Sequence, residues 1–386
     1  MAVRHSGETP GPLTGIRVLD LSSYIAGPYG GSLLADLGAE VIKVEPPEGD
    51  NLRQYPSTLE GESRAFLGVN RSKLGVVLDL KSSGGLSSLL RMAARCDVFL
   101  HSFRPGVPRR LAIDYETLRK INPRMIYCAL SGYGDNGPLR DKPGYDQVLQ
   151  TMTGICQSQG PPDGSPAIVY GSVVDYHAGS LVAFGISSAL YCRERTGKGQ
   201  KVEVSLLASA LAMQSARFIR SEGEARDVDR DMRSGGVTGL HPTRDGYLYI
   251  SANTRDFWKA LCELTGLREL ASDERYSTVR KRNERSAEIV PQVREKLLTR
   301  AAIEWESVFG ERVPCAAARG IGEMFDHPQV VANELAATYE HPTAGSYTGL
   351  HKPLKFSETP GPEPFAAPTL GQHTDQVIGS IGKETE

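Results

Sequence analysis

The chain has 386 residues, and a single hydrophobic core rarely extends beyond about 250–300 residues, so we expect more than one domain. Hydrophobic residues make up 40% and charged residues 23% of the chain, proportions typical of soluble globular proteins and not of disordered ones. The formal net charge of −2 argues against a general electrostatic affinity for nucleic acid or for anionic membranes.

Short apolar runs of strand type alternate with helical segments through the first 220 residues. The predicted strands are 16–21, 41–45, 75–80, 97–101, 125–130 and 201–204. A glycine-rich turn at 26–31 precedes a first helix through Leu33, Leu34 and Leu37. The further predicted helices are 84–94, 115–121, 145–153, 176–193 and 206–220. This alternation predicts an α/β fold with a mainly parallel sheet, covered by helices on both faces.

The composition of the chain changes after residue 220. A run of alternating charge at 221–233 predicts a solvated connection. The next predicted elements are a strand at 247–250 and helices at 256–264, 287–298 and 303–309. They indicate a second, smaller α+β region. From 336 to 368 the chain is rich in Pro, Gly and Thr and is expected to be mostly extended, and a last helix is predicted at 370–381.

Targeting and redox features of the sequence favour a cytoplasmic protein. The first 13 residues contain no apolar segment of the signal-peptide type. The most apolar long stretch, 180–192, is too short to span a bilayer. The six cysteines form no CxxC pair, so we expect reduced, buried thiols and neither a zinc ribbon nor a thioredoxin-type site.

Glycine patterns after two predicted strands raise the question of a nucleotide site. Gly27, Gly30 and Gly31 precede a helix, whose N-terminus could bind a phosphate, but their GxxGG spacing does not match the GxGxxG fingerprint. A literal GxGxxG at 132–137 is followed by Pro138 and charged residues in place of an apolar helix. A dinucleotide site is therefore disfavoured. The sequence also lacks P-loop, GxSxG and HExxH motifs, so no metal is expected.

Phe103 and Arg104 follow the predicted strand 97–101, and Arg110 lies close behind them. In an open α/β sheet, ligands bind beyond the carboxyl ends of the strands. A guanidinium there could bind phosphate, and Phe103 could stack on a purine ring. The alternative interpretation is a solvated turn with a packed Phe.

Asp175 lies in the segment 171–179, where an extended run becomes a helix. One interpretation is a helix N-cap, a position that Asp favours. The other is a nucleophile, because a helix N-terminus would stabilise the carboxylate and keep it ionised. Ala178 and Gly179 are small and would leave space for a bulky ligand.

Several short motifs occur in a fixed order along nearly the whole chain. They are 18–21 with 26–28, 37–45, Asn70 with Lys73, 78–81, 102–106, 130–134, 144–146, 171–179 and 196–202. In this order they resemble the class III CoA-transferases, the family of formyl-CoA transferase, carnitine CoA-transferase and α-methylacyl-CoA racemase. The resemblance assigns the glycines of 132–137 to a family loop.

The resemblance implies a Rossmann-like large domain built from both ends of the chain, with a small α+β domain between them. The implied boundaries are 1–201 and 340–386 for the large, CoA-binding domain, 202–233 for a linker, 234–323 for the small domain and 324–339 for a return linker. It also implies a homodimer in which two open rings interlock.

The resemblance also implies the chemistry. The family's catalytic aspartate matches Asp175, whose carboxylate would attack an acyl-CoA thioester and form anhydride and aspartyl-CoA thioester intermediates. The substrates would be acyl-CoA and a small carboxylic acid, with no tightly bound cofactor and no metal. The positions that match CoA contacts are Leu78, Lys81, Ser102, Phe103, Arg104, Arg110, Tyr145 and Asp146. A mobile glycine loop that covers the site in the family matches Gly235 and Gly236.

The sequence departs from family patterns at a few positions. Val237 and Thr238 interrupt the glycine loop, and Pro46 stands where some members carry an arginine. The racemase-like pattern Gly-His-Asp is replaced here by Gly-Tyr-Asp, because Tyr145 precedes Asp146. A tyrosine, with a pKa near 10, is a poor substitute for a proton-shuttling histidine. We therefore expect a transferase, with an acyl-CoA racemase or isomerase that uses Asp175 as an acid and base as the alternative.

The sequence leaves the identity of the acids open. Arginines near the linker favour a dicarboxylate such as succinate, oxalate or glutarate, and the alternative is that these side chains are simply solvated. They are Arg217, Arg220, Arg226 and Arg230.

Overall fold

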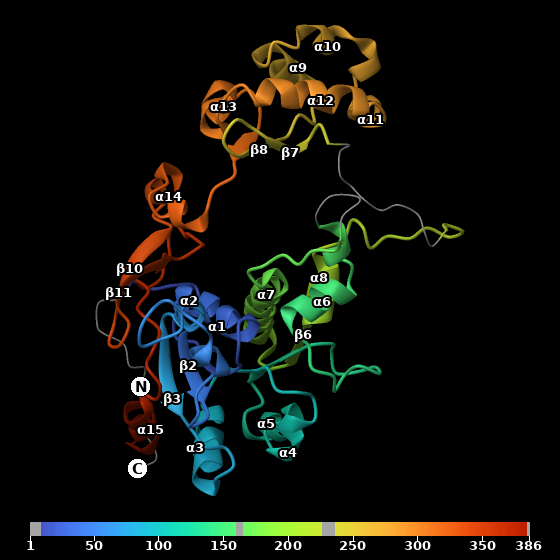
Figure 1. The fold of residues 1–386 in the computed structure, drawn as a ribbon. Helices are drawn as coiled ribbons and strands as arrows, with labels where there is room; N and C mark the ends of the chain where they lie inside the picture. Colours follow the sequence, from blue (N-terminus) through green and yellow to red (C-terminus); the bar gives the residue numbers. More distant parts are fainter. Residues whose placement is uncertain (1–8, 160–164, 226–235, 384–386) are drawn as a thin grey trace. The chain divides into compact units, whose positions relative to one another are not determined.

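The computed structural model describes residues 9–159, 165–225 and 236–383, and the chain divides into two compact units (Figure 1). Unit 1 comprises Met1–Ile219 and Asn333–Glu386, and unit 2 comprises Arg220–Ala332. Unit 1 therefore combines segments from both sides of unit 2 in the sequence. The candidate site described below belongs to unit 1.

A six-stranded parallel sheet forms the centre of unit 1, with the strand order β3-β2-β1-β4-β5-β6. The strands are β1 (Arg17–Leu21), β2 (Glu40–Glu45), β3 (Lys73–Val77), β4 (Val98–His101), β5 (Ile126–Ser131) and β6 (Lys201–Ser205). The predicted parallel sheet is confirmed. The chain first adds β2 and β3 on one side of β1 and then adds β4, β5 and β6 on the other. This reversal between β1 and β4 creates a crevice at their carboxyl ends, where doubly wound sheets bind ligands.

Helices cover both faces of the parallel sheet, as Figure 1 shows. Successive residues of β1 point to opposite faces, so Val18 enters one apolar cluster and Leu19 enters the other, and both are fully buried. Helices α1 and α7 contribute to the cluster of Val18, whereas α3, α5 and α15 contribute to that of Leu19. Their bounds are α1 (Ala26–Asp36), α3 (Ser83–Ala93), α5 (Tyr115–Ile121), α7 (Val173–Thr196) and α15 (Thr374–Lys383).

The glycine-rich segment after β1 is part of helix α1 and not the predicted turn. Its glycines allow α1 and α7 to cross closely. A Cβ atom on Gly30 would lie 2.8 Å from the carbonyl oxygen of Gly179, and a Cβ on Gly179 would lie 2.6 Å from that of Ala26. The prediction of a turn was therefore wrong. Glycine is required at these two positions because the backbones of two helices meet there.

The C-terminal part of unit 1 packs on the edge strand β3. The backbone N–H groups of Gly75 and Val77 donate to Nδ1 of His373 and Oγ1 of Thr374, each at 3.0 Å. The N–H of His373 donates in turn to the carbonyl of Gly75 at 2.8 Å. The preceding segment, expected to be mostly extended, contains an antiparallel hairpin of β10 (Ala336–His341) and β11 (Gly345–Leu350).

Unit 2 contains a three-stranded antiparallel sheet with the order β7-β8-β9, packed against helices. Its core includes the buried side chains of Trp258, Trp305 and Phe309. The strands are β7 (Gly239–Pro242), β8 (Tyr247–Ile250) and β9 (Cys315–Ala317). The helices are α9 (Arg255–Leu264), α10 (Arg268–Ser272), α11 (Val279–Glu284), α12 (Ser286–Leu297), α13 (Ala302–Phe309) and α14 (Pro328–Ala332).

Several short helices complete unit 1. They are α2 (Arg64–Asn70), α4 (Val107–Arg110), α6 (Asp146–Met152) and α8 (Leu206–Ala212), with 3₁₀ turns at Asn51–Gln54 and Cys156–Ser158. Helix α8 ends eight residues before the predicted end at 220. In the part of the chain that the structure describes, α7 alone has the length and apolar composition to cross a bilayer. One side of α7 packs against α1 and the sheet, whereas the side chains of Phe184 and Tyr191 are exposed.

Candidate active site

Two adjoining cavities lie at the carboxyl ends of the strands in unit 1. The first, which we call the Asp175 cavity, has a volume of about 200 Å³, and the second, the Lys81 cavity, has a volume of about 710 Å³. Ser23, after β1, and Phe103, after β4, line both cavities. The cavities therefore meet at the point where the strand order reverses, as expected for a ligand site of this fold.

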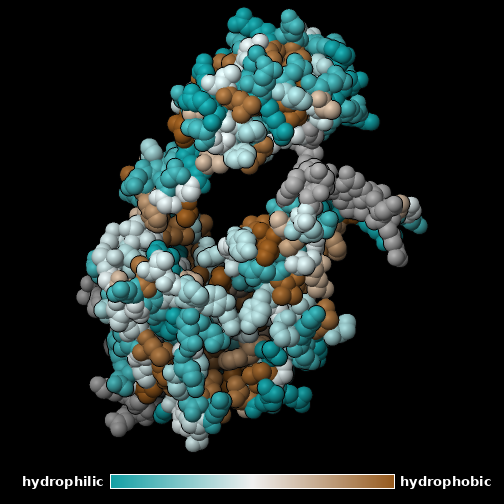
Figure 2. Space-filling view, in the orientation of Figure 1, coloured by the Kyte–Doolittle hydropathy of each residue, from teal (hydrophilic) through white to brown (hydrophobic). Residues whose placement is uncertain are grey.

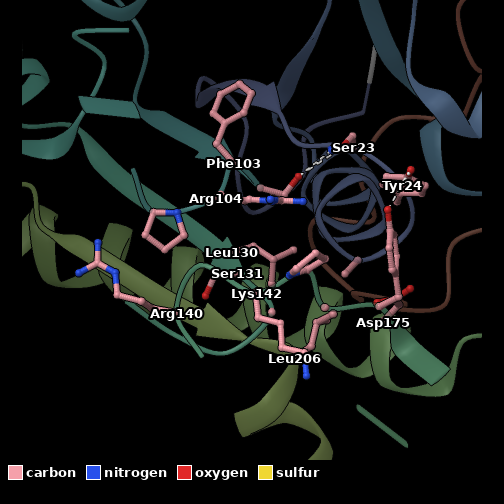
Figure 3. Close-up of a pocket in the computed structure, with 17 residues that line it drawn as sticks. Ser23, Tyr24, Phe103, Arg104, Leu130, Ser131, Arg140, Lys142, Asp175 and Leu206 are labelled. Atoms are coloured by element: carbon pink, nitrogen blue, oxygen red, sulfur yellow. Dashed lines mark hydrogen bonds between the residues drawn. The ribbon is translucent and has the colours of Figure 1, made fainter. Parts of the chain in front are cut away.

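The Asp175 cavity is lined by loops that follow β1, β4 and β5 and by the first turn of α7 (Figure 3). In this view Asp175 and Tyr24 lie at one end and Arg140 at the other, with Arg104 and Lys142 between them. The N–H of Ser23 donates to Oγ of Ser102 at 2.9 Å, which ties the loop after β1 to the loop after β4.

Asp175 is the third residue of α7 and not its N-cap. The N-cap is Ser172, which has a φ of 58° and makes no side-chain capping bond. The acceptor comes instead from Asp146, whose Oδ2 accepts hydrogen bonds from the N–H of Val174 at 2.7 Å and of Asp175 at 3.0 Å. The N-cap interpretation of Asp175 is therefore wrong, and its carboxylate is left to line the cavity.

The pKa of Asp175 is raised to about 7, first by burial and then by the negative charge of Asp146. From the sequence, the helix N-terminus was expected to stabilise the carboxylate and keep it ionised. That expectation was wrong in direction, because the carboxylate is largely buried and because Asp146 occupies the N–H groups of the first turn and adds a like charge. Near neutral pH, Asp175 populates both its acid form and its carboxylate form.

Tyr145 and Tyr24 form the wall of the Asp175 cavity beside the carboxylate. The hydroxyl of Tyr145 donates to that of Tyr24 at 3.2 Å, and Nδ2 of Asn51 donates to the same oxygen at 3.3 Å. The hydrogen bond from Tyr145 is the first cause of the rise in the pKa of Tyr24 to about 12. Tyr24 also has a φ of 64°, a strained backbone conformation of the kind that gathers at functional sites.

Cationic side chains line both cavities. Arg104, Arg140 and Lys142 line the Asp175 cavity, whereas Lys81 and Arg110 line the Lys81 cavity. All five are exposed, so their charges are accessible to an anionic ligand. A guanidinium or ammonium group in such a position suits phosphate or carboxylate oxygens.

Buried ion pairs hold the loops that shape the cavities. Nζ of Lys43 donates to the carbonyl of Ser22 at 2.6 Å and to Oδ2 of Asp50 at 2.7 Å, which fixes the loop after β1. Nζ of Lys73 donates to Oδ2 of Asp20 at 2.8 Å, at the end of β1. Burial lowers the pKa of Lys73 to about 8, although Asp20 opposes this shift. None of these groups is exposed at the protein surface, and Lys43 and Asp50 also belong to the lining of the Lys81 cavity.

The structure brings together most of the residues that the sequence predicted for the site. Ser102, Phe103, Arg104 and Tyr145 line the Asp175 cavity together with Asp175 itself. Leu78, Lys81, Phe103 and Arg110 line the Lys81 cavity, as does Pro46. Asp146 does not line either cavity, because it is buried beneath the first turn of α7.

The remaining predicted positions lie elsewhere. Gly235, Arg226 and Arg230 lie outside the described residues, and Gly236 belongs to unit 2, where its φ is 85°. Arg217 and Arg220 line neither cavity. The glycines of 132–137 belong to a loop that no helix follows until α6, so the helix N-terminus that a dinucleotide fingerprint requires does not follow this loop directly.

Several residues of the site were not predicted from the sequence. Tyr24, Arg140 and Lys142 line the Asp175 cavity but belong to no motif that was singled out. Tyr24 could have been noted because it follows the first strand, at an edge where ligands bind. Among the described residues, no group of three or more His, Cys, Asp or Glu side chains is arranged to hold a metal ion.

Comparisons with known proteins give a consistent result. Residues 13–374 match the family described as CoA-transferase family III. The chain is 33% identical to succinyl-CoA:glutarate CoA-transferase of Mus musculus, over 96% of this chain and 86% of that protein. It is 37% identical to acetyl-CoA:oxalate CoA-transferase of Acetobacter aceti, over 84% of this chain and 85% of that protein. The crystal structure of Rv3272 from M. tuberculosis is similar with a TM-score of 0.82 and 33% identity, over 95% of this chain and 98% of that chain.

Proposed function

The chain belongs to CoA-transferase family III and is a CoA-transferase of that family, and we propose that it moves CoA from an acyl-CoA to a carboxylic acid through covalent intermediates on Asp175. The observation that carries this proposal is the position of Asp175, a carboxylate lining a cavity at the crevice of the sheet. An adjoining cavity offers Lys81 and Arg110 to the phosphates of a long ligand.

The first half of the reaction transfers the acyl group and then CoA to the enzyme. A carboxylate oxygen of Asp175 attacks the thioester carbonyl, a C–O bond forms, the C–S bond breaks and CoA leaves as the thiolate. The thiolate then attacks the aspartyl carbonyl of the mixed anhydride, whose C–O bond breaks and releases the donor acid as a carboxylate. The product is an aspartyl-CoA thioester, and the covalent route divides one difficult exchange into easier steps.

The second half repeats these steps in the opposite sense. The acceptor carboxylate attacks the aspartyl thioester carbonyl, which releases CoA thiolate and forms a second anhydride. The thiolate attacks the acceptor's acyl carbon, and the C–O bond to Asp175 breaks, which restores the carboxylate. Each side of the exchange holds one thioester and one carboxylate, so the balance requires no net proton, electron or water.

We assign the nucleotide end of CoA to the Lys81 cavity and the thioester end to the Asp175 cavity. Phe103 and Ser23 line both, so a single extended molecule at their junction would reach from one to the other. Lys81 and Arg110 would contact phosphates, and Phe103 would contact the body of CoA. The matched positions Leu78, Ser102, Arg104 and Tyr145 complete this proposed contact set.

The substrate acids are proposed from the charges of the Asp175 cavity. Arg140 and Lys142 line it and are exposed, so they can bind a second carboxylate of the acceptor. The relatives named for glutarate and oxalate support a dicarboxylate. These two residues replace the linker arginines as the basis for this preference.

A panel of acids tests the proposed function. Purified protein receives acetyl-CoA or succinyl-CoA together with formate, oxalate, succinate, glutarate or a monocarboxylate, and the CoA products are identified by mass. Acyl-CoA formed from a dicarboxylate supports the proposal. Solvent deuterium entering the acyl α-carbon without any acceptor acid, with no covalent label on Asp175, would instead establish the racemase alternative.

We also propose that the protein is an interlocked homodimer. The combination of both ends of the chain in unit 1 supports the proposed large domain of 1–201 and 340–386. Helix α7 exposes large apolar side chains, with Phe184 71% and Tyr191 67% exposed, and Figure 2 shows hydrophobic surface patches on the visible face of unit 1. Patches of this kind mark interaction surfaces. Light scattering over a dilution series should give about twice the 41.8 kDa mass of the chain, and a stable folded monomer would refute the dimer.

A further inference from the structure

The first turn of α7 is fixed by a side chain from a different helix. We propose that Asp146 is a positioning residue for the transfer reaction, which holds the backbone of Asp175 from outside α7 and places a second negative charge beside the nucleophile. This inference rests on the proposed function, because it takes Asp175 as the covalent nucleophile.

The geometry at the start of α7 requires an outside acceptor. The first N–H groups of a helix have no partner within the helix, and an N-cap side chain normally accepts from one of them. Ser172 does not do so here, and its φ of 58° is left-handed. A single oxygen of Asp146 accepts from both Val174 and Asp175, so the position of the nucleophile's backbone depends on a residue 29 positions earlier.

Asp146 is itself held rigidly. It is 1% exposed, and its other carboxylate oxygen accepts a hydrogen bond from Nε2 of Gln150, one turn later in α6. The amide of Gln150 is fixed in turn by the backbone of Val169, with hydrogen bonds of 2.9 Å to its N–H and to its carbonyl. Both carboxylate oxygens of Asp146 are therefore hydrogen-bonded, one to α7 and one to Gln150.

The titratable and charged groups of the elements around the Asp175 cavity are Asp146 and Tyr145 of the α6 segment, Tyr24 after β1, Arg104 after β4, Arg140 and Lys142 after β5, and Tyr176 and His177, which follow Asp175 in α7. The three cations are exposed and are therefore screened by solvent. Asp146 is buried, and its charge adds to burial in raising the pKa of Asp175.

This arrangement favours the covalent intermediates over the free carboxylate. While Asp175 is ionised, two negative charges lie close together in a poorly solvated place. The anhydride and the aspartyl-CoA thioester are both neutral at this position, so forming either one removes the repulsion. A carboxylate with a raised pKa is also the stronger nucleophile, in line with the general relation between basicity and nucleophilicity.

The variant Asp146→Asn removes the charge and keeps an acceptor for α7, because its amide oxygen can still accept from the N–H groups of Val174 and Asp175. Its NH2 group then faces the donor Nε2 of Gln150 and that hydrogen bond is lost. Gln150→Ala loses the same hydrogen bond but keeps the charge of Asp146, so it is made in parallel as the control for this change in geometry. We expect the acidic limb of the pH–rate profile to move down by about one pH unit, because the like charge is gone. We expect the rate above that limb to fall about 3-fold, because the nucleophile is less basic.

Two further variants complete the test. Asp146→Ala removes the acceptor and should lower kcat far more than Asp146→Asn. Asp114→Asn changes another capping aspartate, which accepts from the N–H of Thr117 at the start of α5, and should leave the pH profile unchanged.

The readouts are initial rates between pH 5 and 9 with succinyl-CoA or acetyl-CoA and the best acceptor of the acid panel. They are accompanied by covalent labelling of Asp175 with acyl-CoA and hydroxylamine. An acidic limb at the same pH in wild type and Asp146→Asn would overturn the role of Asp146, provided that Asp175 is labelled in both. If Asp175 is never labelled in the wild type, the proposed function itself fails.

Discussion

Oδ2 of Asp146 accepts a hydrogen bond from the backbone N–H of Asp175 at 3.0 Å. Two acidic residues of different helices are therefore linked through a backbone group and not through an ion pair. The neighbour of Asp146 in the sequence, Tyr145, lies in the wall of the cavity that Asp175 lines. Tyr145 and Asp146 thus connect the wall of the cavity to the backbone of Asp175. A substitution at either residue should alter both the cavity wall and the position of Asp175.

The first prediction concerns the nucleophile. Asp175→Asn preserves the shape of the side chain but removes the carboxylate that forms the anhydride, so CoA transfer should fall by about 10³-fold or more. Incubation with acyl-CoA and hydroxylamine followed by peptide mass spectrometry should label Asp175 in the wild type and not in the variant. A variant that keeps more than a tenth of the wild-type rate would contradict the covalent mechanism.

The same substitution gives a prediction about stability. In the folded protein the pKa of Asp175 is raised to about 7 from 3.8, so the wild type loses stability as the pH rises from about 4 to 7. Asp175→Asn carries no such charge and should be more stable than the wild type at pH 8, by up to about 4 kcal/mol. Below pH 4 the two should be equally stable. Thermal unfolding measured from pH 4 to 8 checks this, and a difference independent of pH would show that the pKa is not raised.

A third prediction concerns CoA binding. Arg110 lines the Lys81 cavity, whereas the adjacent Arg109, which is also exposed, lines neither cavity. Arg110→Ala should raise the KM for acyl-CoA about 10-fold with little change in kcat, because it removes a contact that substrate and transition state share. Arg109→Ala is the matched control and should leave KM within a factor of two. Equal effects of both variants would mean that only the general surface charge matters.

The fourth prediction concerns the crossing of α1 and α7. Gly30→Ala would force a Cβ atom to within 2.8 Å of the backbone of Gly179, so it should destabilise the protein by about 1–3 kcal/mol. Gly68→Ala, in α2, is the control, since a Cβ there meets no atom within 4 Å and a helical alanine is favoured over glycine. Denaturant unfolding of both variants gives the comparison. A Gly30→Ala protein as stable as Gly68→Ala would show that the helices can move apart freely.

Local sequence patterns predicted the strands and helices of unit 1 well, because hydrophobic periodicity reports burial directly. The predicted helix 115–121 coincides with α5, and the strands 16–21 and 97–101 differ from β1 and β4 by one residue. The hairpin of β10 and β11 was missed because Pro, Gly and Thr dominate the segment around it and weaken the strand pattern. Glycine has two opposite uses, in turns and in close helix crossings, and the sequence around Gly30 does not distinguish them.

The residues that line the cavities could be predicted from the sequence more easily than the buried residues that hold them in place. Lys81, Phe103, Arg104 and Asp175 follow elements whose ends gather at one edge of the sheet, so their convergence follows from topology. The hydrogen bonds of Asp146 join two helices that are distant in the sequence, and no local pattern records that pairing. The pKa of Asp175 depends first on burial and then on the charge of Asp146, both of which arise from tertiary structure, and this is why its direction was predicted wrongly.

The packing of His373 and Thr374 against strand β3 has a consequence for synthesis on the ribosome. Unit 2 is one continuous stretch of chain, so every residue of its core has been translated before the last part of unit 1 emerges. The edge of β3 keeps unpaired N–H groups at Gly75 and Val77 until residues 373 and 374 leave the exit tunnel. The nascent chain therefore carries an open strand edge for nearly 300 residues of elongation, an interval in which a chaperone has a defined segment to protect.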